Sequence, residues 1–69
     1  MRLSARNVLK GKIIDVKKGV TTAHVRIELP GGAVITSSIT NEAVEELQLR
    51  VGNDAYAVIK ASDVMMACD

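Results

Sequence analysis

Residues 22–29 alternate strictly between polar and apolar side chains, and this alternation constrains the fold more than any other feature of the chain. A two-residue period of this length is typical of a β-strand with one face buried and the other in water. Pro30-Gly31-Gly32 then predicts a turn, and the β-branched run over 33–39 predicts the return strand of a hairpin. The apolar members of the alternation are Ala23, Val25, Ile27 and Leu29.

Three further segments have the composition of strands. Residues 7–16 predict a long strand with a bulge or bend at Gly11, because a glycine inside a strand weakens regular pairing. Residues 55–60 predict another strand, and residues 63–67 predict a short last one. Together with the hairpin, these segments give about five strands.

One segment has a helical period instead. A short helix is expected over about 40–49, plugging one end of the sheet, with Thr40 as the N-cap and Asn41 as the competing candidate. About five strands, with one short helix between the third and the fourth, predict an all-β fold. The expected architecture is a five-stranded, OB-like Greek-key barrel that forms a single domain over residues 1–69.

The small size of the chain predicts self-association. In 69 residues there is one cysteine, Cys68, and one histidine, His24, so no disulfide framework or cluster of metal ligands supports the fold. A core of this size supplies only about 3–5 kcal/mol. Although 48% of the residues are hydrophobic, Tyr56 is the sole aromatic residue, so aliphatic side chains form the core. We expect part of this aliphatic surface to lie between the subunits of a homo-oligomer.

Charge and hydropathy restrict the partners and the location. The formal net charge is +1, which does not predict a nucleic-acid-binding surface. No run of 18 apolar residues occurs and the start lacks the apolar core of a secretory signal, so no membrane partner is expected. One unpaired cysteine is compatible with a reducing compartment. The expected location is the cytoplasm.

Two short stretches carry the chemistry. Ser4-Ala5-Arg6-Asn7 and Lys60-Ala61-Ser62-Asp63 each place one cation beside small residues, and each includes at least one small residue with a hydroxyl or amide group. Neither stretch has a bulky side chain that would keep a ligand away from the backbone. This combination suits a small oxyanion held by N–H and O–H donors. Asp63 is expected to have a structural role, because a carboxylate repels an anion.

The same residues resemble a known family. Ser4–Asn7, residues 33–40 and the stretch Val58-Ile59-Lys60-Ala61-Ser62-Asp63-Val64-Met65 resemble the molbindins, also called molybdenum-pterin-binding proteins or Mop, which are single-domain relatives of TOBE domains. The resemblance covers essentially the whole chain. It implies an OB-like fold, a homohexamer built as a trimer of dimers, and binding of molybdate or tungstate at subunit interfaces for storage or homeostasis.

The resemblance also implies two types of oxyanion site. The first site would combine Ser4, Ala5, Arg6 and Asn7 of one subunit with Lys60, Ala61 and Ser62 of another. The second site would lie near a three-fold axis, with Gly19, Val20, Thr21, Thr22, Ser37 and Ser38 as candidates.

From the residues alone, simpler interpretations stay open. Arg6 is also compatible with an ordinary surface cation, Lys60 with a lysine at a sheet edge, and the Thr and Ser pairs with solvated strand positions. Two other functions are compatible with an OB-like fold: a nucleic-acid-binding module, or a regulatory interaction domain without a storage role. An enzyme is not expected, because no acid–base pair, nucleophile or metal cluster is visible. A bound pterin is not expected either, because the chain offers almost no aromatic side chain for stacking.

Overall fold

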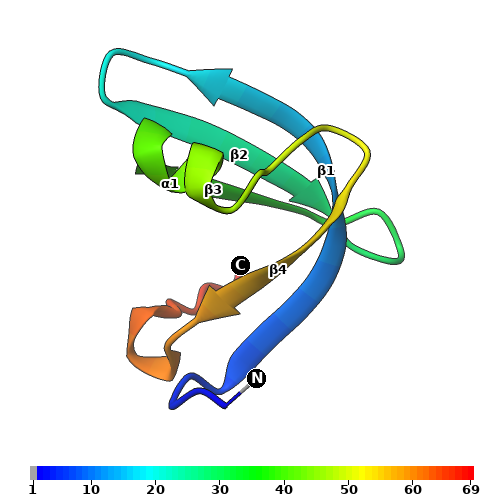
Figure 1. Cartoon of the computed structure of the whole chain (residues 1–69). Helices are drawn as coiled ribbons and strands as arrows, with labels where there is room; N and C mark the ends of the chain where they lie inside the picture. The colour runs from blue at the N-terminus through cyan, green and yellow to red at the C-terminus, as the bar shows by residue number, and fades with distance from the viewer. Residues whose placement is uncertain (1) are drawn as a thin grey trace.

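The computed structural model describes residues 2–69, which form one curled antiparallel sheet of four strands and one short α-helix (Figure 1). The elements are β1 (Asn7–Lys18), β2 (Thr22–Glu28), β3 (Val34–Thr40), α1 (Asn41–Glu46), β4 (Asp54–Ile59) and a 3₁₀ turn (Ala61–Asp63). The sheet order is β3-β2-β1-β4, so the fourth strand returns beside the first, as in a Greek key. The all-β, OB-like fold class is confirmed. The sheet has four strands instead of five, and β3 does not pair with β4 within residues 2–69, so no closed barrel forms there.

Strand β1 pairs in antiparallel fashion with two other strands. Its first half pairs with β4, from Asn7 opposite Ile59 to Lys12 opposite Asp54. Its second half pairs with β2 and ends with Lys18 opposite Ala23. The long, bent β1 therefore runs through the whole molecule and connects its two ends (Figure 1).

The core lies on the concave face of the sheet, where α1 covers one end. The helix contacts β2 and β3, and its Val44 is buried against the strands. The predicted helix at one end of the sheet is confirmed, and no helix within residues 2–69 is long and apolar enough to cross a membrane. The buried core residues are Ile13, Ala23, Val25, Ile27 and Val44.

The helix is shorter than the predicted range of 40–49. Thr40 is the N-cap, and its hydroxyl accepts a hydrogen bond from the backbone N–H of Ala43 (3.0 Å). The helix ends at Glu46, because Gln48 adopts a positive φ of 52° and turns the chain away. Nothing in the side-chain pattern marks this reversal, since a left-handed residue is more often glycine or asparagine.

The irregular point of β1 is not Gly11. The pairing between β1 and β2 shifts between Ile13 and Asp15, so the extra residue of the bulge is Ile14. The bulge leaves Ile13 only 1% exposed while Ile14 is 38% exposed. Gly11 is instead a point of close approach between strands: a Cβ atom there would lie 2.8 Å from the carbonyl oxygen of Glu28.

Gly11→Ala is therefore expected to destabilise the fold by about 1–3 kcal/mol, because backbone, not a flexible side chain, occupies the space. Urea unfolding followed by circular dichroism measures the loss. Gly19→Ala is a milder comparison, since its nearest neighbour lies 3.0 Å away in an exposed turn. Unchanged stability in Gly11→Ala would contradict the close approach.

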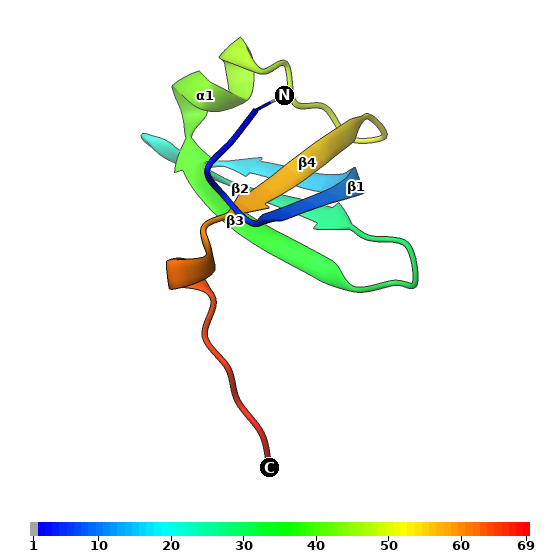
Figure 2. The same cartoon turned by 90° about the horizontal axis from the view of Figure 1, so that it is seen from below.

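The predicted strand over 63–67 is wrong. The chain makes a 3₁₀ turn at Ala61–Asp63 and then continues as an extended tail that leaves the body of the molecule (Figure 2). Met65 and Met66 are 91% and 89% exposed. A strand needs a neighbouring edge to pair with, and residues 64–69 pair with no strand in the described chain.

Candidate anion-binding sites

The pairing of β1 with β4 brings the two stretches of the first site together. Asn7, the first residue of β1, lies opposite Ile59, the last residue of β4. The Asn7 side-chain amide donates a hydrogen bond to the carbonyl oxygen of Ile59 (3.2 Å) and joins the two strand ends. Ser4–Arg6 and Lys60–Ser62 consequently extend from the same end of the sheet, already within one chain.

At the end of the sheet where β1 meets β4, backbone carbonyl oxygens accept hydrogen bonds, while neighbouring backbone N–H groups have no acceptor within residues 2–69. Three successive carbonyl oxygens accept hydrogen bonds, whereas the N–H groups of Ala61 and Ser62 donate to no acceptor within residues 2–69. A surface that binds an oxyanion through N–H groups needs this separation, because an oxyanion carries only acceptor atoms. The bonds are Asn7 Nδ2 to Ile59 O (3.2 Å), Asp63 N to Lys60 O (2.9 Å) and Val64 N to Ala61 O (3.3 Å).

Two cations lie at this end of the sheet. Arg6 and Lys60 are exposed, and neither makes an ion pair with another described residue. Four other cations lie close to carboxylates: Lys10 and Lys12 approach Asp54 at 3.8 and 3.5 Å, and Lys18 and Arg50 both pair with Glu45. The positive charge at the first site is thus available to a ligand.

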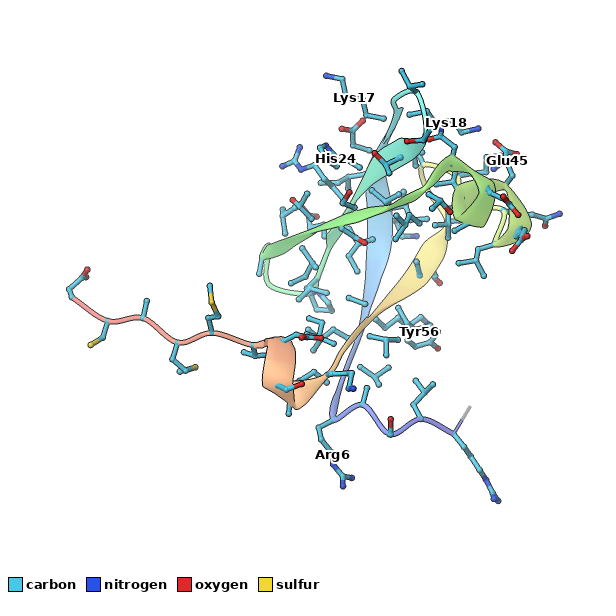
Figure 3. The ribbon with its side chains drawn as sticks, turned by 90° about the vertical axis from the view of Figure 1, so that its left-hand side faces the viewer. Arg6, Lys17, Lys18, His24, Glu45 and Tyr56 are labelled. Carbon is cyan, nitrogen blue, oxygen red and sulfur yellow. The ribbon has the colours of Figure 1, made fainter. Side chains whose placement is uncertain are left out.

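The second site begins in the turn between β1 and β2. The Gly19 N–H donates to the carbonyl oxygen of Thr22 (2.7 Å) and closes the turn. Asn41, at the start of α1, donates to the three carbonyl oxygens of the turn: its side-chain amide to Gly19 (2.9 Å) and Val20 (3.3 Å), and its backbone N–H to Thr21 (2.9 Å). This turn lies at the opposite end of the sheet from Arg6, beside Lys17 and Lys18 (Figure 3).

The remaining candidates of the second site do not meet at one point within the chain. Ser38 lies opposite His24, and Thr22 follows on the same outer face, because alternate residues of a strand share a face. Ser37 lies opposite the buried Val25, on the other face of the sheet. Of the three candidates that lie on strands, Thr22 and Ser38 therefore share the outer face of the sheet, and Ser37 does not.

Neither site is enclosed by a single chain. Two depressions, of about 360 and 450 Å³, open on the surface. One lies under α1 beside Val44 and Leu49, and the other lies between Lys12 and Pro30. No residue of the first or second site lines either depression. In the described part of the chain, no group of three His, Cys, Asp or Glu residues is arranged to hold a metal ion.

Comparison with known proteins identifies relatives over the full length. The family model for the TOBE domain matches residues 3–66. Molybdenum-pterin-binding protein 1 of Clostridium pasteurianum is 53% identical over 66 residues, which cover 96% of this chain and 97% of that protein.

Two solved structures have the same fold. MopII from Clostridium pasteurianum superposes with a TM-score of 0.91 at 49% identity, covering 97% of this chain and all of that chain. The cytoplasmic molybdate-binding protein ModG, solved with molybdate bound, superposes with a TM-score of 0.91 at 51% identity, covering 94% of this chain and 46% of that chain. The protein belongs to the TOBE-domain family, in the group of molybdenum-pterin-binding proteins.

Proposed function

We propose that this protein binds molybdate, and tungstate in its place, for storage or homeostasis of the oxyanion in the cytoplasm. The observation that carries the proposal is the end of the sheet where β1 meets β4. There the carbonyl oxygens of residues 59–61 are occupied, the N–H groups of Ala61 and Ser62 are open, and Arg6 and Lys60 at the same end of the sheet form no ion pair within residues 2–69. The relatives named for molybdenum and the molybdate-bound ModG support the same ligand.

Molybdate fits this chemistry because it is a tetrahedral dianion with four acceptor oxygens. Backbone N–H groups, the Ser4 and Ser62 hydroxyls and two charged side chains are all donors. Charge-assisted hydrogen bonds from Arg6 and Lys60 are about twice as strong as neutral ones. Monohydrogen phosphate carries a proton that would meet a donor, and sulfate has a smaller oxygen tetrahedron. A donor-only cage of fixed size therefore prefers molybdate.

We infer that the cage is completed by another subunit in a homohexamer arranged as a trimer of dimers. The first site is open to solvent in the single chain, and apolar side chains around it are exposed. An aliphatic surface of this kind next to an incomplete site suits a contact between copies of the chain. The exposed apolar residues at this end are Leu3, Val8, Leu9, Tyr56, Val58 and Val64.

The proposed role is binding without catalysis, of the free oxyanion and not of a pterin. A pterin ring is usually held by stacking on aromatic side chains. Tyr56 is the sole aromatic residue, and it lies on the outer face of β4, opposite Lys10.

Molybdate at a hundredfold excess over its Kd is expected to raise the melting temperature by about 10 °C, because a ligand that binds only the folded assembly stabilises it. Elemental analysis after dialysis against molybdate gives the number of ions per chain, and the same experiment with sulfate is the control. The proposal fails if molybdate leaves the melting temperature unchanged, or if sulfate raises it equally.

A further inference from the structure

We propose that Asn41 is a positioning residue for the second site, holding the Gly19–Thr21 turn in the orientation that offers N–H donors to an oxyanion. The inference rests on the proposed function, because it concerns how one of the two molybdate sites is built. It adds a residue that lies outside both sets of candidate ligands and that would act through the turn instead of touching the anion.

The first step concerns the carbonyl groups. Asn41 donates hydrogen bonds to three successive carbonyl oxygens, those of Gly19, Val20 and Thr21, at 2.9, 3.3 and 2.9 Å. The three carbonyl oxygens of the turn therefore all point toward Asn41, on the side of the turn that faces α1. An oxyanion approaching from the opposite side meets none of these oxygens, which would otherwise repel it.

The second step follows from the planarity of the peptide. In a trans peptide the N–H of one residue points away from the C=O of the residue before it, and the described chain contains no cis peptide bond. When the carbonyls of Gly19 and Val20 point toward Asn41, the N–H groups of Val20 and Thr21 point away from it. Neither of these N–H groups donates to an acceptor within residues 2–69. Val20 is 98% exposed, and Thr21 is exposed as well.

The third step concerns the choice of asparagine. The Oδ1 atom of Asn41 is buried and accepts no hydrogen bond from the described residues, so the side chain is used here for its donor group. Turning the amide over would place Oδ1 against the carbonyl oxygens of Gly19 and Val20. Aspartate has nearly the same shape but presents acceptors only, so it cannot hold the turn in this way.

The ion pairs next to the turn leave it compatible with an anion. Glu45 of α1 is paired with Lys18, which directly precedes the turn, and with Arg50 at 3.6 Å. Its carboxylate is thus shared by two cations, which reduces the repulsion that it would exert on a nearby oxyanion. The corner of the molecule that holds the turn therefore does not carry an uncompensated Glu45 charge.

The test uses the full-length protein titrated with molybdate. In the unmodified protein, the amide NMR signals of Val20 and Thr21 are expected to shift together with those of Ala61 and Ser62. In Asn41→Ala and Asn41→Asp, the affinity at the Val20 and Thr21 amides is expected to fall by about tenfold or more, while the Ala61 and Ser62 amides titrate as before. Asn53→Ala is the matched control, because the Asn53 side chain makes no hydrogen bond within residues 2–69.

The outcomes separate this inference from the proposed function. If neither the Val20 and Thr21 amides nor the Ala61 and Ser62 amides shift when molybdate is added to the unmodified protein, the proposed molybdate-binding function is overturned. A response at Ala61 and Ser62 alone, or an unchanged affinity at Val20 and Thr21 in the Asn41 variants, would overturn only the role of Asn41. The titration of the unmodified protein shows whether the turn binds the anion even if a variant fails to fold. A general loss of structure in a variant would also weaken the first site, which distinguishes it from loss of positioning.

Discussion

Lys60→Glu is expected to weaken molybdate binding at the first site by at least about 100-fold. The substitution replaces the Lys60 ammonium, which forms no ion pair within residues 2–69, by a carboxylate next to the N–H groups of Ala61 and Ser62, which have no acceptor there either. Two unit charges about 4 Å apart near a protein surface interact by roughly 4 kcal/mol, so reversing one charge next to a dianion exceeds the roughly 2.7 kcal/mol that a 100-fold loss represents. Calorimetric titration with molybdate measures the change.

Lys17→Glu is the matched control, because it makes the same change in net charge. Lys17 is exposed and lies at the opposite end of β1 from Arg6 (Figure 3). Its substitution should leave the affinity of the first site within about threefold, since the separation exceeds the ~8 Å over which salt screens charges in physiological buffer. Equal losses in the two variants would mean that net charge alone attracts the anion, and that Lys60 has no place in the site.

Ile13→Ala is expected to remove about 2–5 kcal/mol of unfolding free energy, because it empties a position that is 1% exposed in the centre of the core. A domain of this size has about that much stability in total, so the variant should be largely unfolded at about 37 °C. Urea unfolding at one fixed protein concentration measures the effect, because subunit association makes stability depend on concentration.

Ile14→Ala is the comparison for this variant and should cost less than about 1 kcal/mol. The chemical change is identical, but Ile14 is the extra residue of the bulge and is 38% exposed. If Ile14→Ala proved the more damaging of the two, the bulge would have to lie elsewhere in β1, with the faces of the neighbouring residues exchanged.

This pair of isoleucines shows where the sequence was informative and where it was not. The alternation over 22–29 predicted β2 and its buried face correctly, because a regular strand repeats every two residues. In β1 the two isoleucines are adjacent, and the side chains alone do not indicate which one faces the core. Pairing with β2 decides this, and pairing is a long-range property.

The ends of the chain show the same limit. Local chemistry predicts Thr40 as the helix cap, and the structure confirms it. Residues 63–67 have apolar side chains that suit a strand, but no edge of the described sheet pairs with them. Likewise, the sequence marks Asn41 only as a candidate cap, because it gives no sign that a turn about 20 residues earlier folds back onto this residue.

Composition and resemblance point to the two stretches of the first site, and the pairing of β1 with β4 explains why they lie together. Asn7 and Ile59 are separated by 52 positions in the sequence but are neighbours across β1 and β4. The subunit that completes the site, and the symmetry of the assembly, remain predictions of the proposed function.

The length of β1 has a consequence for how the protein would fill with ligand. Its twelve residues would span about 40 Å if straight, and the molecule that contains the bent strand is 35 Å long. One site begins at the start of this strand and the other begins just after its end. The two sites lie at opposite ends of the sheet (Figure 3), and physiological salt screens charges over about 8 Å, so a dianion bound at one end of a chain has little effect on the Coulomb energy of binding at its other end. Within one chain, both ends can therefore be loaded at the same ligand concentration without mutual electrostatic opposition.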